Sequence, residues 1–240
     1  MIQNEIVNLT VDCLQKYFYE MGMKKLDDMV INLKDIYDCV IYPNYELSLI
    51  TNLDLGDHQK QKVLGKTICD EKVILIDKSI APETHDPRFI FTFGHEIGHG
   101  LLHNQKQPFF RCTNDSICNE ADLYEKQANE FAENLIMPHN LVKYRYQQYY
   151  DTNKPFRYIG ATTYYLNHKR CQINSLLHLC KEIAKPLTPY FSHISKESLG
   201  YSLIKLNLIQ NETKETINNF KEYTQTTNLL GSVLNNVLKI

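Results

Sequence analysis

A helical metal-binding pattern is the feature that most restricts how this chain can fold. The pattern is His95-Glu96-Ile97-Gly98-His99. On an α-helix, residues four apart lie one above the other, so His95 and His99 project from one face and can hold the same metal ion. Glu96 falls on the flank of that face, where it is placed to take a proton from a water rather than to bind the metal. The pattern therefore predicts a zinc site on a helix.

The flanking residues support a helix around this pattern. Asp86-Pro87 is a favourable N-cap and first-turn pair, and the segment 104–108 contains residues that end a helix. Glycines inside a helix each cost about 1 kcal/mol relative to alanine. The helix would contain three of them, Gly94, Gly98 and Gly100. We therefore expect a neighbouring element to pass close to this backbone.

A second helix is expected over residues 119–138, because acidic residues crowd its first turn and Pro138 ends it. One face of this helix carries a carboxylate, an amide, two alanines and an isoleucine, namely Glu125, Asn129, Ala128, Ala132 and Ile136. A catalytic zinc needs three protein ligands, and a Glu from a second helix is a standard way to complete a His pair. Glu125 is the candidate third ligand, although spacing alone leaves it as one of several acids on this helix. Asn129, one turn on, is expected to orient a ligand or contact substrate.

Four histidine and tyrosine side chains are candidates for supporting roles. His103 lies four residues beyond His99, and about 12 Å along the helix axis from His95, which is too far to share one ion. We expect His103 to support a neighbouring residue or to contact substrate. Tyr124, His139 and His85 are candidates for stabilising a developing oxyanion, and the sequence does not choose among them.

The spacing of apolar residues predicts an α+β fold. Residues 5–23 and 26–36 show helical spacing, and beyond residue 46 the pattern changes to short strands at 47–51, 62–64 and 72–77. Tight connections between these strands indicate a small antiparallel sheet. The H-E-x-x-H helix follows at once, so the order predicts a zincin-like core in which the sheet packs against that helix and the Glu-bearing helix.

Composition favours a cytoplasmic protein without general affinity for nucleic acid or membrane. The formal net charge is -2, so any DNA binding would need a local basic patch. The seven cysteines form no closely spaced framework, which suits a reducing compartment. The first residues lack the features of a leader peptide, and no stretch approaches the length of a membrane-spanning helix.

Both motifs together closely resemble the ImmA/IrrE family of zinc metallopeptidases. Residues 88–103 and 125–138 match the family motifs in order and separation, and the resemblance covers about 47–138. In that family, two His and the Glu opening the second motif are metal ligands, and the Glu after the first His is catalytic. These roles carry over to His95, His99, Glu125 and Glu96. Gly94, where Ala is common in the family, and Gly100, which replaces a larger residue, do not touch the proposed ligands.

The resemblance implies a zinc-dependent endopeptidase, with manganese as an alternative metal. Family members cleave or inactivate repressors of the helix-turn-helix type and thereby switch on mobile-element or stress genes in bacteria. The implied partner is therefore a cytoplasmic repressor protein. Two alternatives are a module that sequesters the repressor without cutting it and a metal-containing DNA-binding regulator. An intact Glu96 argues against pure sequestration, because binding alone needs no base beside the water.

Three regions are expected along the chain: a zincin-like core at 1–146, a helical appendage at 147–184 and a helical C-terminal extension at 185–240. Residues 185–189 resemble a linker, and apolar residues recur at helical spacing over 212–240.

The appendage is expected to contain two short helices around a turn at 166–169, similar to the helix-turn-helix-like appendage of several ImmA/IrrE proteins. Lys169 and Arg170 would then begin the second helix, where a DNA reader makes contacts. A helical hairpin that packs or binds the substrate protein is the favoured interpretation, because there are two basic residues and no overall positive charge.

Overall fold

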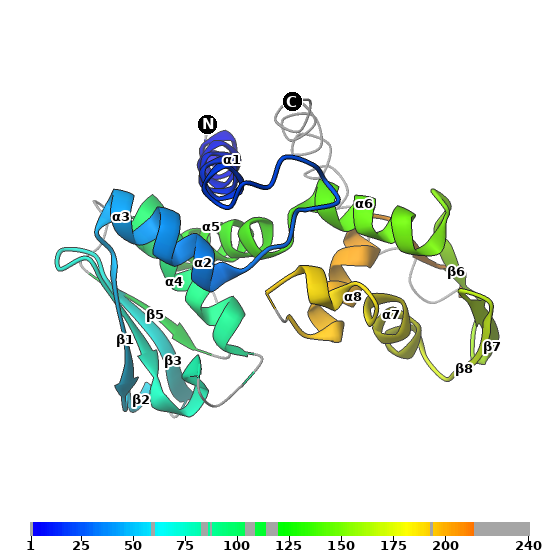
Figure 1. The fold of residues 1–240 in the computed structure, drawn as a ribbon. Helices are drawn as coiled ribbons and strands as arrows, with labels where there is room; N and C mark the ends of the chain where they lie inside the picture. Colours follow the sequence, from blue (N-terminus) through cyan, green and yellow to red (C-terminus); the bar gives the residue numbers. More distant parts are fainter. Residues whose placement is uncertain are drawn as a thin grey trace. The chain divides into compact units, whose positions relative to one another are not determined.

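The change from helical to alternating spacing near residue 46 corresponds, in the computed structural model, to a change from helices to a sheet (Figure 1). The structure describes residues 2–58, 61–82, 86, 88–103, 109–113, 120–192 and 194–213. They belong to two units, the first comprising Met1–Met23 and Ile31–Ile136 and the second comprising Lys24–Val30 and Met137–Ile240. The division after Ile136 precedes the boundary expected at 146, and both expected C-terminal regions fall in one unit.

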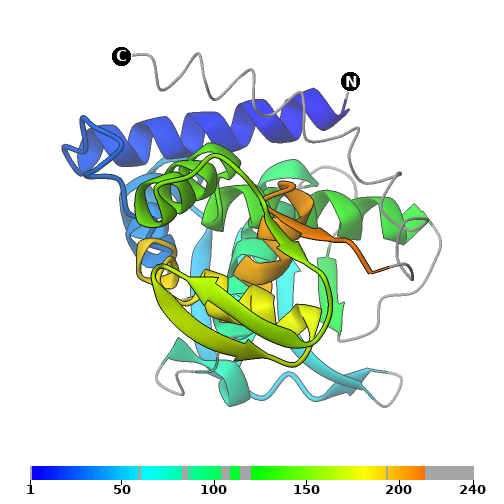
Figure 2. The ribbon, with the colours of Figure 1, turned by 90° about the vertical axis from the view of Figure 1, so that its right-hand side faces the viewer.

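The first unit begins with α1 (Ile2–Glu20), one long helix (Figure 2). One side of this helix is buried, as the helical spacing of its apolar residues predicts. The buried side includes Ile6, Leu14 and Tyr17. After the segment that belongs to the second unit, three short helical turns follow: α2 (Leu33–Ile36), η1 (Tyr37–Ile41) and α3 (Tyr42–Tyr45).

The prediction of a helix over 26–36 is wrong in its first part. The helix starts only after Asn32, whose side chain accepts hydrogen bonds from the backbone N–H groups of Lys34 and Asp35. Asn is a strong N-cap residue, so it favours a helix start at this position rather than an earlier one.

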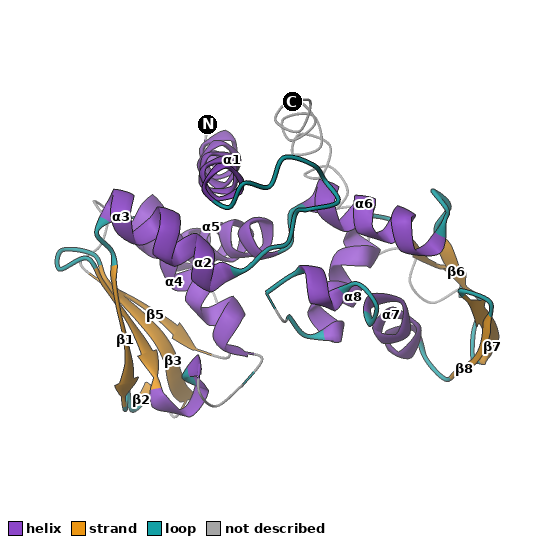
Figure 3. Cartoon of the chain, in the orientation of Figure 1, coloured by secondary structure: helices purple, strands orange, loops and turns teal. Residues whose placement is uncertain are grey.

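A five-stranded sheet forms the next layer, and Figure 3 shows it with α4 on one side. Its strands are β1 (Ser48–Leu53), β2 (Asp57–His58), β3 (Gln61–Ile68), β4 (Val73–Asp77) and β5 (Phe109–Thr113). The order is β1-β4-β3-β2, with β5 also paired to β3. The sheet is mixed rather than wholly antiparallel as expected, because β1 pairs with the outer edge of β4 in the same direction, while β3 pairs antiparallel with β4, β2 and β5.

The helix that carries the H-E-x-x-H pattern, α4 (Arg88–Leu102), packs on β3 and β4 and also against α5 (Glu120–Ile136). Its start is capped as predicted, because the Asp86 carboxylate accepts a hydrogen bond from the backbone N–H of Arg88 at 2.9 Å. α4 therefore lies between the sheet and α5.

Two of the three glycines of α4, Gly98 and Gly100, allow close packing by neighbouring residues, as the sequence predicted. A Cβ atom added to Gly98 would lie 3.1 Å from the Cα atom of Ala128 on α5. One added to Gly94 would lie 3.4 Å from the Cβ atom of Ala132, and one added to Gly100 would lie 2.7 Å from Leu47 Cδ2. Gly98 therefore marks the closest approach of the two helix backbones.

The second unit contains the helices α6 (His139–Tyr150), α7 (Leu176–Ala184), η4 (Thr188–Tyr190) and α8 (Lys196–Lys205). α7 packs against α8. β6 (Phe156–Tyr158) pairs in parallel with β9 (Ile209–Asn211). Leu187 is fully buried, so the stretch expected to be a linker is a packed part of this unit.

The helix-turn-helix expectation is wrong, because residues 162–173 form a β-hairpin (Figure 2). β7 (Thr162–Leu166) pairs antiparallel with β8 (Lys169–Ile173). The β-branched and aromatic residues of β7 favour a strand. Asn167 and His168 both have positive φ angles, 45° and 64°, as a two-residue hairpin turn of type I′ requires. Lys169 and Arg170 therefore lie on a strand and do not begin a recognition helix.

Three predictions concern residues outside the described part of the chain: the oxyanion-stabilising role of His85, the helix stop at 104–108 and the apolar stripe beyond residue 213. In the part of the chain that the structure describes, no helix has both the length and the apolar character needed to cross a membrane.

Candidate metal centre

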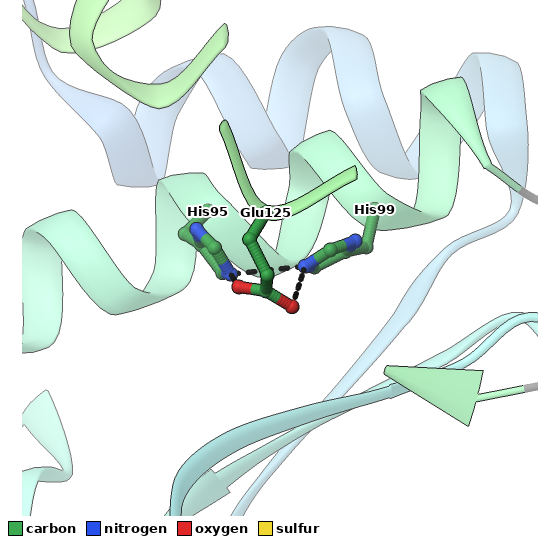
Figure 4. A group of neighbouring side chains, drawn as sticks. All are labelled: His95, His99 and Glu125. Carbon is green, nitrogen blue, oxygen red and sulfur yellow. Dashed lines mark hydrogen bonds and ion pairs between the residues drawn. The ribbon is translucent and has the colours of Figure 1, made fainter. Parts of the chain in front are cut away.

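α4 and α5 bring two imidazoles and one carboxylate to a common point (Figure 4). The Nε2 atoms of His95 and His99 are 2.9 Å apart. Glu125 Oε2 lies 3.1 Å from His95 Nε2, and Glu125 Oε1 lies 3.3 Å from His99 Nε2. The Glu125 carboxylate thus reaches from α5 to both rings of α4. Among the described residues, this is the one group of three or more His, Cys, Asp or Glu side chains gathered in this way.

The spacing and chemistry of this group fit a zinc ion. Ligands at 2.0–2.2 Å from a tetrahedral zinc are about 3.3 Å from one another, close to the separations found here. Two imidazole nitrogens and one carboxylate oxygen form a donor set typical of catalytic zinc, which leaves one position for water or substrate. His95 and His99 are buried, whereas the Glu125 side chain retains 14% exposure.

The charges of the group also favour a cation. Burial raises the pKa of Glu125, but its hydrogen bonds to His95 and His99 and their charges outweigh burial and bring the pKa down to about 2. Burial lowers the pKa of His99 to about 4. Burial also lowers the pKa of His95. The hydrogen bond of His95 to Glu125 and the charges of Glu96 and Glu125 outweigh burial, so the pKa of His95 is raised overall. At neutral pH, the metal-free group therefore contains an ionised carboxylate and at least one neutral imidazole.

Glu96 is fully buried beside this group and is held by strand β3. Thr67 Oγ1 lies 2.6 Å from Glu96 Oε2 and 2.9 Å from the main-chain oxygen of Glu96. The other carboxylate oxygen, Oε1, accepts no hydrogen bond from any described residue. Burial raises the pKa of Glu96 to about 7, although His95 and the Thr67 hydrogen bond oppose the rise. A carboxylate with this pKa is suited to accept and return a proton near neutral pH.

Gly65, two residues before Thr67 on β3, provides the space that Glu96 occupies. A Cβ atom at this position would lie 2.5 Å from Glu96 Oε1. Any side chain here would displace the carboxylate, so the glycine is required by the position of Glu96.

Both imidazoles are held through their Nδ1 atoms. His95 Nδ1 lies 2.8 Å from Asn129 Oδ1, a contact that can orient the His95 ring. His99 Nδ1 lies 3.0 Å from His103 Nδ1. His103 is fully buried and is not one of the three residues of the group; its predicted supporting role stays a prediction. The Tyr124 ring packs against the His103 ring, with centroids 4.8 Å apart.

Residues 50–168 match the sequence profile of the peptidase family M78, described as the IrrE N-terminal-like domain. The chain belongs to this family. No curated protein matches the sequence. The profile covers both motifs, so the family match indicates a metallopeptidase domain, and the geometry adds that His95, His99 and Glu125 form a group that could hold a metal ion.

Two polar residues of this M78 domain were missed from the sequence. The sequence did contain a signal for Thr67. Val63, Gly65 and Thr67 lie on one buried face of a strand, where a polar residue and a glycine are unusual. Gln127, whose Oε1 lies 2.9 Å from His103 Nε2, gave no such signal. At about 100° per residue it points away from the Glu125 face, and its contact depends on how the two helices cross.

His139 is the remaining predicted residue. It is buried and begins α6, in the second unit rather than in the unit that holds the metal group. Its predicted role as an oxyanion-stabilising residue remains a prediction.

Proposed function

We propose that this M78-family protein is a zinc-dependent endopeptidase in which His95, His99 and Glu125 hold the metal and Glu96 is the general base. The observation that carries the proposal is the position of the Glu125 carboxylate, within 3.3 Å of both Nε2 atoms. A second carboxylate, Glu96, is buried beside the group, and its Oε2 atom contacts Thr67. Two carboxylates in two environments correspond to two roles: one ionised ligand, and one base with a pKa near neutrality.

In the proposed reaction, bound zinc would polarise the scissile carbonyl and acidify a water molecule. Glu96 accepts the proton of the attacking water and later returns it to the leaving amine. Thr67 keeps the Glu96 carboxylate in one orientation during both transfers, because its hydroxyl contacts Oε2 at 2.6 Å. Asn129 keeps the His95 ring in place through its contact with Nδ1.

We further propose that the substrate is a cytoplasmic transcriptional repressor with a helix-turn-helix domain. Its cleavage would derepress mobile-element or stress genes. Support for this substrate comes from the family resemblance of the two motifs and not from the side chains of the site.

The experiment is to incubate the zinc-loaded protein with purified helix-turn-helix repressors from its own host and to follow each repressor by mass spectrometry and operator binding. We expect the wild type to cut one or a few peptide bonds, and Glu96→Gln to lose at least about a hundredfold in rate, because removal of a general base costs this much. Glu133→Gln removes a carboxylate of α5 outside the metal group and should cut like the wild type.

If the wild type and Glu96→Gln abolish operator binding equally while the repressor remains intact, hydrolysis is excluded and sequestration replaces it. Manganese in place of zinc, tested in parallel, identifies the metal that supports the faster cleavage.

A further inference from the structure

A chain of buried polar contacts connects the ligand His99 to helix α5. His99 Nδ1 lies 3.0 Å from His103 Nδ1, and His103 Nε2 lies 2.9 Å from Gln127 Oε1. His103 is 0% exposed and Gln127 is 5% exposed. Each of these hydrogen bonds needs one donor and one acceptor. The donor and acceptor roles along the chain of contacts are therefore linked, and fixing one of them fixes the others.

The Gln127 oxygen sets that direction. An amide oxygen only accepts, so His103 Nε2 must carry a hydrogen and donate it. A neutral His103 then has a lone pair on Nδ1, which accepts the hydrogen on Nδ1 of His99. His99 is left with its lone pair on Nε2, the atom that faces His95 and Glu125.

The opposite arrangement would prevent metal binding. If the Gln127 amide were reversed, its NH₂ group would donate to His103 Nε2, and His103 Nδ1 would donate to His99. His99 would then carry its hydrogen on Nε2, and a protonated nitrogen cannot bind a metal ion. The direction of this chain of contacts therefore decides whether His99 is a ligand.

We propose that His103 and Gln127 are positioning residues that fix His99 in the tautomer whose Nε2 carries no hydrogen. The inference rests on the proposed metal centre and deepens it. Asn129 performs the same task directly for His95. Helix α5 thus supplies one ligand and sets the tautomers of the other two, through Asn129 for one ring and through the His103–Gln127 pair for the other.

The tautomers can be observed directly by long-range ¹H–¹⁵N correlation spectra of the histidine rings in the zinc-loaded wild-type protein. We expect His103 to carry its hydrogen on Nε2 and His99 to carry its hydrogen on Nδ1. A His103 ring with its hydrogen on Nδ1 would overturn the proposal, whatever the activity of the protein. This measurement needs no variant, so it decides the matter even if substitutions at Gln127 prevent folding.

Zinc affinity, measured by competition with a chromophoric chelator and zinc alone as the probe, tests the consequence. Gln127→Met removes the acceptor at similar volume and should weaken zinc binding by about ten- to a hundredfold, as is typical when a residue that supports a metal ligand is lost. Gln127→Glu keeps an acceptor oxygen and should restore the affinity. Asn134→Leu is the matched control, because Asn134 is a buried amide on the same helix whose Nδ2 has no partner among the described residues.

The outcomes separate this inference from the proposed function. If Gln127→Met binds zinc as tightly as the wild type, the positioning role is overturned while the metal centre stands. If Asn134→Leu weakens zinc binding as much as Gln127→Met, the effect is general to buried amides of α5 and the specific role is also overturned. A wild-type protein that binds no zinc would overturn the metal centre and this inference together.

Discussion

The Thr67 hydroxyl is the one side-chain group seen to hold the general-base candidate, Glu96, among the described residues. Thr67→Val keeps the shape of the side chain but leaves Glu96 Oε2 without its partner. We expect kcat for repressor cleavage to fall by about ten- to a hundredfold with little change in KM, because the hydroxyl orients the base and does not bind substrate. Thr67→Ser should retain most of the activity. Equal rates for wild type and Thr67→Val would show that Glu96 needs no such support.

Glu96 also gives the metal-free protein a characteristic pH dependence. Burial raises the pKa of Glu96 from 4.5 to about 7 in the fold, so its contribution to stability is fully present below pH 4.5 and is lost as the pH rises through 7. Glu96→Gln removes this loss. The variant should therefore gain in free energy of unfolding relative to the wild type as the pH rises, by up to about 3 kcal/mol above pH 7.

Urea unfolding of both proteins in the presence of a chelator, from pH 4.5 to 8.5, measures this difference. Two stability profiles that stay parallel over this range would show that the Glu96 carboxyl is not buried as described.

At the scale of elements, the contact between α4 and α5 determines whether Glu125 reaches the imidazoles. Gly98→Ala would place a Cβ atom 3.1 Å from Ala128 Cα, so the two backbones must move apart. We expect a loss of about 1–3 kcal/mol in stability, as for other overpacked sites, and weaker zinc binding. Gly94→Ala is the matched substitution, with an ordinary 3.4 Å contact to Ala132 Cβ, and should be neutral or stabilising by up to about 1 kcal/mol. Thermal unfolding and zinc titration of both variants test this contrast, and equal effects would contradict it.

The elements that the sequence predicted well are those with strong periodicity and clear ends. α4 and α5 were predicted because a metal motif, an N-cap and Pro138 define them, and together they provide most of the site. The hairpin β7–β8 was mistaken for two helices because its turn, Asn167-His168, lacks the glycine that usually marks such turns. The parallel pairing of β1 with β4 depends on which edge of the sheet is free, and local sequence does not contain that information.

At the scale of the whole molecule, the chain contributes the segment Lys24–Val30 to the second unit and then returns to the first. Arg145 on α6 holds this segment: its Nη2 atom donates to the main-chain oxygens of Leu26, Asp27 and Met29 at 3.1, 2.9 and 2.8 Å. Its guanidinium also lies 4.0 Å from the centre of the Tyr190 ring. Arg145 is far from this segment in the sequence. Local patterns therefore could not predict that Lys24–Val30 belongs to the second unit.

Arg145→Met would leave these oxygens without their donor. We expect the free energy of unfolding to fall by about 2–4 kcal/mol, because unsatisfied part-buried carbonyl groups are costly. Arg145→Lys should recover only part of the loss, since a single ammonium cannot reproduce the planar guanidinium that also stacks on Tyr190. Zinc affinity should stay unchanged in both variants, because the metal group lies wholly in the first unit. Loss of zinc binding without loss of stability would contradict this assignment.

The most direct test is X-ray diffraction at the zinc absorption edge from crystals of the zinc-loaded protein. We expect one anomalous peak per chain, about 2.0–2.2 Å from His95 Nε2, His99 Nε2 and a Glu125 carboxylate oxygen, with Glu96 outside bonding distance. A peak elsewhere in the chain, or a Glu125 side chain turned away from the ion, would contradict the proposed metal centre and the hydrolysis that depends on it.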